Sequence, residues 1–218
     1  QLKLYPCQVI KDTQLEKDYF EGKYKPYTKE ELEKVLAEMM TLVPLYCRVM
    51  RMMREFPQEY LVAGTTRLDL RKEIEDLMRK KKMKLHEIRY REIGFNLRNI
   101  DKNIQLKTSK YKASNGDEFF LEFVNKDDIL FGLLRLRLSK KTDLKELKGC
   151  ALIRELHVYG RALELGEKGD LSQHIGLGKE LMRKAEEIAK KNGFQKIAVI
   201  SGIGVREYYR RLGYEQKG

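Results

Sequence analysis

The stretch Gln173-His174-Ile175-Gly176-Leu177-Gly178 decides the fold, because it places a glycine-containing turn between a strand pattern and a long helix pattern. Glycines have no side chain, so successive backbone N–H groups can approach an anion there. The helix that follows adds the positive end of its dipole at the same place. The turn therefore predicts a binding site for a pyrophosphate group.

Two common nucleotide-binding motifs do not fit this turn. A dinucleotide-binding G-x-G-x-x-G turn needs its first glycine where this chain has Gln173. A P-loop needs a lysine followed by Ser or Thr after its last glycine, whereas Gly178 is followed by Lys179-Glu180. The turn is therefore expected to bind the pyrophosphate of a ligand that neither of these two motifs binds.

The segments around the turn alternate between strand and helix patterns. A strand is expected over residues 151–159, and an amphipathic helix runs from Leu177 to the helix-ending pair Asn192-Gly193. The β-branched run 196–201 predicts a second buried strand. A short helix over 205–212 then carries Tyr208-Tyr209-Arg210-Arg211-Leu212-Gly213-Tyr214.

Strand, Q-x-x-G-x-G turn, helix, strand and Y-Y-R-R-L-G-Y, in this order, resemble the core of the GNAT acetyltransferases. The resemblance implies that acetyl-CoA binds here, with its pyrophosphate on the turn and its pantetheine arm along a strand that splays from its neighbour. It also implies a tyrosine of the last helix near the thioester sulfur. The cofactor-binding residues expected on this basis are Glu155, Leu156, His157, Val158, Gln173, His174, Gly176, Leu177, Gly178, Lys179 and Tyr208.

Further segments resemble the Elongator catalytic-subunit family over nearly the whole chain. They are Leu133-Leu134-Arg135-Leu136-Arg137, Arg154-Glu155-Leu156-His157-Val158-Tyr159-Gly160, Ala198-Val199-Ile200-Ser201-Gly202, Leu2-Lys3-Leu4-Tyr5-Pro6 and Arg89-Tyr90-Arg91-Glu92-Ile93-Gly94. The resemblance implies a fragment that lacks most of a radical S-adenosylmethionine domain. S-adenosylmethionine and an iron–sulfur cluster are implied only for that missing domain. The implied partners are tRNA, the missing domain, and a second copy or other Elongator-type subunits.

The expected fold class is α/β, of the α+β kind, with a GNAT-like mixed central sheet flanked by helices and preceded by a helical, basic linker. The pattern changes from helical to strand-like after Ile88, and we place the domain boundary near residue 95. Residues 1–95 are then the end of the radical domain plus the linker, and residues 96–218 the acetyltransferase domain. Asn115-Gly116 predicts a hairpin inside the second domain.

No metal site is expected in this chain. Cys7, Cys47 and Cys150 show no C-x-x-C spacing, so they cannot supply the cysteine triad of an iron–sulfur cluster. His86 and Glu87, in the stretch where many relatives carry zinc-binding cysteines, cannot form a tetrahedral site by themselves.

The chain has 218 residues and is strongly basic. Its 45 Lys and Arg against 33 Asp and Glu give a net charge of +12, which favours a polyanionic partner. A solvated surface from a Lys-rich proteome explains the charge equally well. Three scattered cysteines indicate a reducing compartment, and no signal peptide or membrane-spanning stretch is recognisable, so we expect a cytoplasmic protein.

Two amphipathic helices are expected in the N-terminal part. Thr28-Lys29-Glu30-Glu31 predicts a capping box that starts the first, whose buried face comprises Leu32, Val35, Leu36, Met39, Met40 and Val43, and which Pro44 kinks or ends. The second spans Leu70–Lys82, with Arg71 and the lysines facing outward. Basic and aromatic residues here could hold phosphates and stack on unpaired bases, and resemblance to the Elongator subunit makes tRNA the expected ligand. Arg48, Arg51 and Arg54 follow at three-residue spacing, which predicts one basic face for this segment. The RNA-binding candidates are Arg48, Arg51, Arg54, Lys80, Lys81, Lys82, Arg89 and Arg91.

The catalytic candidates are Tyr208, Tyr209, Glu155 and His157. A phenol near the thioester sulfur can protonate the leaving thiolate, and the resemblance favours Tyr208 for the contact with the cofactor. Tyrosines could also simply pack on the sheet. Glu155 and His157 share one face of their strand, where they could activate an amine or water, or form a hydrogen-bonded core pair.

Three functions fit these patterns. The first is the acetyltransferase half of an Elongator-like enzyme that modifies carbon 5 of the wobble uridine of tRNA, with acetyl-CoA cleavage stimulated by tRNA. This chain alone is then expected to bind or hydrolyse acetyl-CoA only. The second is a conventional protein-lysine or small-amine N-acetyltransferase with Glu155 as base. The third is a noncatalytic RNA-binding module.

Overall fold

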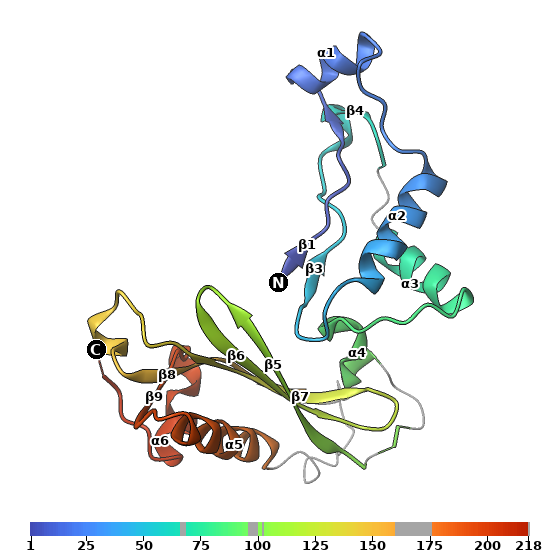
Figure 1. The fold of residues 1–218 in the computed structure, drawn as a ribbon. Helices are drawn as coiled ribbons and strands as arrows, with labels where there is room; N and C mark the ends of the chain where they lie inside the picture. The colour runs from blue at the N-terminus through green and yellow to red at the C-terminus, as the bar shows by residue number, and fades with distance from the viewer. Residues whose placement is uncertain (66–68, 96–99, 102, 160–175, 218) are drawn as a thin grey trace. The chain divides into compact units, whose positions relative to one another are not determined.

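The computed structural model describes residues 1–65, 69–95, 100–101, 103–159 and 176–217. The chain divides into two compact units, Gln1–Arg91 and Glu92–Gly218 (Figure 1). The sequence-based boundary near residue 95 stays a prediction, because residues 96–99 lie outside the described part.

The first unit combines short helices with two small sheets. Strand β1 pairs in parallel with β3, and β2 pairs antiparallel with β4. The strands span Leu2–Lys3 (β1), Val9–Ile10 (β2), Val49–Arg51 (β3) and Leu61–Ala63 (β4), and a 3-10 turn spans Gln58–Tyr60. The helices span Gln14–Phe20 (α1), Lys29–Thr41 (α2), Leu70–Lys80 (α3) and Ile88–Arg91 (α4).

Helix α2 begins at the predicted capping box. The Thr28 hydroxyl accepts a hydrogen bond from the Glu31 N–H at 3.3 Å, and the Glu31 carboxylate accepts one from the Thr28 N–H at 2.8 Å. The helix ends at Thr41, three residues before Pro44. Its buried face differs from the predicted one at Met39, which is 41% exposed, because the core lies on the side of Ala37.

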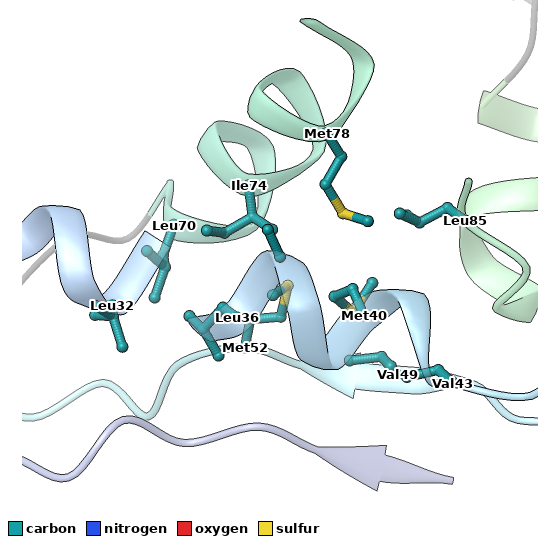
Figure 2. Close-up of a cluster of buried hydrophobic side chains, with 11 residues drawn as sticks. Leu32, Leu36, Met40, Val43, Val49, Met52, Leu70, Ile74, Met78 and Leu85 are labelled. Atoms are coloured by element: carbon teal, nitrogen blue, oxygen red, sulfur yellow. The ribbon is translucent and has the colours of Figure 1, made fainter. Parts of the chain in front are cut away.

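The core of this unit is a cluster of side chains from α2, β3 and α3, with Leu85 beyond α3 (Figure 2). Leu36 and Met40 of α2 point toward Ile74 and Met78 of α3. The full set of buried residues is Leu32, Leu36, Ala37, Met40, Val43, Val49, Met52, Leu70, Ile74, Met78 and Leu85. The amphipathic pattern of both helices is therefore explained by their packing against each other and against β3.

Three expectations for this unit are wrong. The spacing of Arg48, Arg51 and Arg54 does not form one basic face, because Val49–Arg51 is a strand and the chain continues without helix through Arg54. The pattern does not become strand-like at Ile88, since α4 starts there. Arg71 does not face outward, because it forms an ion pair with Glu87, whose side chain is 0% exposed.

The second unit is built on a five-stranded mixed sheet with the order β5-β6-β7-β8-β9 (Figure 1). Strands β5 to β8 are antiparallel, and β9 is parallel to β8. The strands span Gln105–Ala113 (β5), Gly116–Val124 (β6), Leu130–Leu138 (β7), Cys150–Val158 (β8) and Lys196–Val199 (β9). The helices are α5 (Leu177–Lys191) and α6 (Arg206–Arg211), with 3-10 turns at Ile93–Phe95, Lys145–Leu147 and Ile203–Val205. The predicted mixed α/β fold class is confirmed.

The predicted hairpin joins β5 to β6. Ala113 pairs with Gly116, so the two loop residues are Ser114 and Asn115, with φ of 45° and 59°. Two positive φ values identify a type I′ turn, whose twist matches that of the flanking strands.

Helix α5 packs against one face of the sheet. Leu181 lies over this face at Gly132 of β7, where its Cδ1 would be in ordinary contact, at 3.6 Å, with a Cβ atom at position 132. Leu181 and Ala185 are 0% exposed, as expected for the apolar stripe of the helix. The start of α5 is thereby held at the end of β8, where the candidate site lies.

Candidate functional site

The ladder between β8 and β9 ends halfway along β8. Cys150 to Ile153 pair with Lys196 to Val199, and the Ile200 N–H still donates to the Ile153 carbonyl at 3.3 Å. From Arg154 to Val158, β8 pairs only with β7 among the described residues. The sheet therefore opens between these two parallel strands.

A bulge marks the point where the opening begins. Arg135 pairs with Glu155, but the next residue, Leu136, pairs with Ile153, so Arg154 is the extra residue. Such a bulge bends a strand and re-aims its side chains. It lets Ile153 and Leu156 face α5 together, although strict alternation would place them on opposite faces.

The backbone of Leu156 and Val158 is available to a ligand in this opening. The Tyr159 N–H donates to Phe131 of β7 at 2.8 Å, so the alternation of an antiparallel ladder turns the N–H groups of Leu156 and Val158 away from β7. Both were expected to bind cofactor, and this geometry is compatible with main-chain hydrogen bonds to an extended arm.

The first turn of α5 lies at the same end of the sheet. Gly176 has a left-handed φ of 114°, and its carbonyl accepts the first helical hydrogen bond, from Glu180 N–H at 2.9 Å. The N–H groups of Leu177, Gly178 and Lys179 therefore have no partner within the helix. Leu177 and Gly178 are buried, and Lys179 is exposed. Gln173 and His174 lie outside the described residues.

Tyr208 reaches from α6 to this helix start. A Cβ atom on Gly178 would lie 2.6 Å from the Tyr208 hydroxyl oxygen and 3.6 Å from Val158 Cγ2, so the three groups meet at one point. The hydroxyl is buried and has no hydrogen-bond partner among the described residues. Burial raises the pKa of this phenol above its ordinary value.

Tyr209 turns to a different environment. Its ring stands edge-on to Tyr208 at 5.2 Å between centroids and to Tyr214 at 6.1 Å. Burial, and then the neighbouring Tyr208, raise the pKa of Tyr209. Tyr208, rather than Tyr209, contacts the start of α5.

Glu155 and His157 lie on the sheet face opposite α5, and they do not pair with each other. Glu155 Oε2 accepts a hydrogen bond from Arg135 Nε at 2.6 Å. His157 is exposed and its ring lies 4.6 Å from that of Tyr159. A core pair of Glu155 with His157 is therefore excluded.

Sequence reasoning missed the arginines that organise this face. Arg137 and Arg154 both donate to Glu118 Oε1, at 2.8 and 2.9 Å, and Glu118 is only 1% exposed. Arg135 also lies over the Phe120 ring at 5.1 Å. Charged residues at every second position of a strand were the available signal, because they place several charges on one face.

The RNA-binding candidates occupy different environments in the first unit. Arg51 and Arg54 are exposed, and the Arg54 guanidinium lies 4.9 Å from the centre of the Phe56 ring. Lys80, Lys81 and Lys82 are exposed at the end of α3. Arg48 is half-buried, and Arg89 is half-buried beside β3, with Nη1 3.4 Å from the Met50 carbonyl.

Arg91 does not fit a phosphate-binding role. It is 3% exposed and donates to the carbonyls of His86 and Leu45 at 2.9 and 3.0 Å. Its guanidinium joins chain segments instead of facing solvent, so we remove Arg91 from the candidate RNA surface.

Metal-binding groups are not assembled in the part of the chain that the structure describes. No cluster of three or more His, Cys, Asp or Glu side chains is present among those residues. Cys7, Cys47 and Cys150 are free cysteines. Among the described helices, none has both the length and the apolar character needed to cross a membrane.

The chain belongs to the acetyltransferase (GNAT) family, whose model matches residues 101–214. Residues 1–82 match the radical SAM C-terminal domain. The opening between β8 and β9 and the start of α5 both fall within the acetyltransferase match.

The relatives that match the whole chain carry more specific names. A "tRNA uridine(34) acetyltransferase" of Dehalococcoides mccartyi is 41% identical, over 98% of this chain and 48% of its own length. Human "Elongator complex protein 3" is 38% identical, over 100% of this chain and 41% of its own length. A solved structure of Elp3 from Methanocaldococcus infernus, with an N-terminal deletion, superposes with a TM-score of 0.87 at 39% identity, over 99% of this chain and 53% of that one. The chain thus spans less than half the length of these two curated relatives.

Proposed function

We propose that this chain binds acetyl-CoA in the opening between β8 and β9 and cleaves the thioester when tRNA binds, as part of an enzyme that modifies carbon 5 of the wobble uridine. Membership of the acetyltransferase family supports the cofactor, and the names of the relatives support the nucleic acid. The observation that carries the proposal is the buried Tyr208 hydroxyl at Gly178 and Val158, without a partner among the described residues.

The binding step uses backbone groups of two elements. The N–H groups of the first turn of α5, which have no partner within the helix, donate hydrogen bonds to the pyrophosphate, and the helix dipole adds to the attraction. Lys179, exposed beside them, screens the phosphate charge. The pantetheine arm lies along β8 and accepts hydrogen bonds from the N–H groups of Leu156 and Val158.

The chemical step needs an acid at the sulfur. In hydrolysis, water attacks the thioester carbonyl carbon and loses a proton to solvent, the carbon–sulfur bond breaks, and acetic acid is formed, which ionises to acetate. The Tyr208 hydroxyl gives its proton to the departing sulfur, which leaves as the CoA thiol. The phenolate then regains a proton from solvent. Because burial raises its pKa, Tyr208 stays protonated at neutral pH and can act as the acid in every cycle.

Glu155 is a weaker candidate for catalysis than Tyr208. Its Oε2 is already bonded to Arg135 Nε, and its side chain lies on the face opposite α5. The alternative function, N-acetylation of a lysine or small amine, needs Glu155 as a base. The ion pair with Arg135 gives Glu155 a structural role instead, which disfavours this alternative. His157 is exposed and could contact the acceptor from the same face.

The basic residues of the first unit are proposed to hold tRNA. Arg51, Arg54 and the run Lys80–Lys82 present exposed charges, and Phe56 beside Arg54 offers a ring on which an unpaired base can stack. A cytoplasmic location and partners of the Elongator type belong to this proposal as well.

The radical chemistry that the family resemblance implies is not assigned to the residues described here. An iron–sulfur cluster needs closely grouped cysteine thiolates, whereas Cys7, Cys47 and Cys150 are separate free cysteines. These residues do not fit the group, so no step of the reaction is derived through it.

The experiment that tests the proposal measures release of free CoA from acetyl-CoA by the purified chain, alone, with bulk tRNA, and with a lysine peptide. The expected result is release that rises with tRNA and falls about 100-fold in Tyr208→Phe, the usual contribution of a general acid. Acetylation of the peptide without a tRNA effect would establish the N-acetyltransferase instead. Binding of tRNA without any turnover would leave an RNA-binding module.

A further inference from the structure

The motif Tyr208-Tyr209-Arg210-Arg211-Leu212-Gly213-Tyr214 contains more than the proposed acid. Tyr208 reaches the start of α5, and the last two residues of the motif also have defined positions. The contacts of Gly213 and Tyr214 connect the end of α6 to the middle of α5.

Helix α6 ends in a Schellman motif, which fixes the direction of Tyr214. The Gly213 N–H donates to the Arg210 carbonyl at 2.9 Å, and the Tyr214 N–H donates to the Tyr209 carbonyl at 3.0 Å. Gly213 has a left-handed φ of 88°, which a residue with a side chain adopts only with strain. The turn brings the Tyr214 ring back onto Tyr209, at 6.1 Å between centroids.

The Tyr214 hydroxyl then attaches α6 to α5. It donates a hydrogen bond of 2.7 Å to Glu186 Oε1, and α5 is the helix whose first turn contains Gly178. Helix α6 is thus held against α5 at two places, by Tyr208 at Gly178 and by Tyr214 at Glu186. The edge-on Tyr208–Tyr209 and Tyr209–Tyr214 contacts join the two places into one row of rings.

We propose that Tyr214 and Glu186 are positioning residues for the acid Tyr208, acting through the Tyr209 ring and the end of α6. The inference rests on the proposed function, in which Tyr208 protonates the sulfur. A proton donor must lie within hydrogen-bond reach of its acceptor, so a small displacement of a six-residue helix reduces the rate more than the binding of the cofactor. Tyr214 and Glu186 bond to each other and are given no contact with the cofactor in this proposal.

The first test compares Tyr214→Phe, which removes only the hydroxyl, with the wild-type chain in tRNA-stimulated release of CoA. The expected result is a fall in kcat of about tenfold, with KM for acetyl-CoA within about twofold, since the row of rings remains and only its attachment is removed. Glu186→Gln retains an acceptor oxygen and should retain most of the rate, whereas Glu186→Ala should behave like Tyr214→Phe. Glu187→Gln is the matched control, because the neighbouring Glu187 pairs with Arg183 and Lys184 on the outer side of α5.

The second test is a double-mutant comparison in the Tyr208→Phe background. If Tyr214 acts through Tyr208, adding Tyr214→Phe to Tyr208→Phe changes kcat by less than about twofold. A further tenfold loss in that background would overturn the inference, because Tyr214 would then act independently. If Tyr208→Phe lowers the rate of CoA release but Tyr214→Phe does not, the positioning role is refuted and the proposed function stays intact.

The third test needs no turnover, so it tests the coupling of Tyr214 to Tyr208 separately from the proposed function. Carbon-13 labelling of the tyrosine Cζ atoms allows each phenol to be titrated by NMR, with Tyr208 identified by the signal missing from Tyr208→Phe. Tyr214→Phe is expected to lower the pKa of Tyr208 toward the ordinary value, because α6 no longer holds the hydroxyl in its buried place. A titration of Tyr208 that is unchanged in Tyr214→Phe excludes the proposed coupling.

Discussion

The hydroxyl oxygen of Tyr208 would lie 2.6 Å from a Cβ atom on residue 178, so the absence of a side chain at Gly178 is what allows the phenol to reach the first turn of α5. The glycine expected to admit a phosphate also admits the proposed acid. The turn proposed to bind phosphate and the proposed proton donor are therefore sterically coupled through one residue.

Gly178→Ala is expected to destabilise the wild-type chain by about 1–3 kcal/mol, the usual cost of overpacking, because the rigid Tyr208 ring must move. In the Tyr208→Phe background, Gly178→Ala should instead increase the free energy of unfolding. The nearest remaining atoms, the ring carbon Cζ and Val158 Cγ2, would lie 3.6 Å away, which is ordinary contact. Alanine is also a better helix former than glycine by up to about 1 kcal/mol.

Chemical denaturation of the wild type, Gly178→Ala, Tyr208→Phe and the double variant measures the coupling between residues 178 and 208. Gly204→Ala is the control, since a Cβ atom there meets nothing within 4 Å, and its effect should add to that of Tyr208→Phe. Equal effects of Gly178→Ala with and without the Tyr208 hydroxyl would contradict the contact.

Acetyl-CoA cleavage should depend on pH through Tyr208. The phenol acts in its protonated form, and burial raises its pKa, so the rate should fall only when the pH exceeds the ordinary tyrosine value of about 10. In Tyr208→Phe this alkaline limb should be absent from the residual rate. A pH–rate profile of kcat, with folding verified by circular dichroism at each pH, makes the measurement; an unchanged alkaline limb in the variant would assign it to another group.

The free energy of unfolding should also fall at alkaline pH, because of Tyr214. Burial, then the hydrogen bond to Glu186, raise the pKa of Tyr214 in the folded chain. The contribution of the Tyr214 phenol to the free energy of unfolding is fully present below its unfolded pKa of about 10. It is lost as the pH rises toward the higher pKa of the folded chain. Unfolding free energies measured between pH 9 and 11 (values chosen to bracket that pKa of about 10) should fall less steeply in Tyr214→Phe than in the wild type. Equal slopes would show that the Tyr214 phenol does not gain protection on folding.

Much of the fold follows from local signals in the sequence. The capping box at Thr28 starts α2 through side-chain hydrogen bonds. Asn115 in the hairpin and Gly193 after α5 have left-handed φ values of 59° and 83°, which few residue types adopt readily. The opening beside β8 is expected from the resemblance to the GNAT acetyltransferases, because the pattern of residues alone does not show that two parallel strands separate.

The errors occur where distant contacts outweigh local pattern. Arg154 becomes a bulge only because β7 imposes its register on β8, which no property of residues 151–159 by themselves indicates. Arg71 looks like a solvated helix position, but Glu87 comes to it from another segment, 16 residues later. The family resemblance alone favours Tyr208 over Tyr209, because the space over Gly178 is visible only in the packed structure.

Removing the lysine run at the end of α3 should weaken tRNA binding, because fewer phosphates are then neutralised. The triple variant of Lys80, Lys81 and Lys82 to alanine should bind bulk tRNA more weakly and with a flatter salt dependence, by about 0.7–0.9 in the log–log slope for each phosphate that the lysines no longer neutralise. Changing Lys190, Lys191 and Lys196 to alanine is the control with the same change in net charge. Filter binding at several salt concentrations distinguishes the two; equal changes in slope would mean that net charge alone attracts the RNA.

The ion pair between Glu87 and Arg71 should contribute strongly to the free energy of unfolding of the first unit. The Glu87 side chain is 0% exposed and accepts the N–H groups of Val49, Arg89 and Tyr90 at 2.8–3.0 Å as well as the Arg71 guanidinium. It thereby joins β3 and α3 to the start of α4. Arg71 in turn donates to the Val49 carbonyl at 2.7 Å, so the pair also closes onto the strand.

Arg71→Ala removes the counter-charge but leaves the buried carboxylate, and the expected loss of unfolding free energy is about 3–5 kcal/mol. Adding Glu87→Gln should recover part of that loss, because the amide keeps an acceptor for the backbone N–H groups without an uncompensated charge. Lys72→Ala, at the adjacent exposed position of α3, should stay within about 0.5 kcal/mol of the wild type. Denaturant unfolding followed by helix content measures all four chains. If Arg71→Ala cost no more than Lys72→Ala, the ion pair would add nothing to the backbone hydrogen bonds of Glu87, and the packing of α2 on α3 would have to hold the unit together by itself.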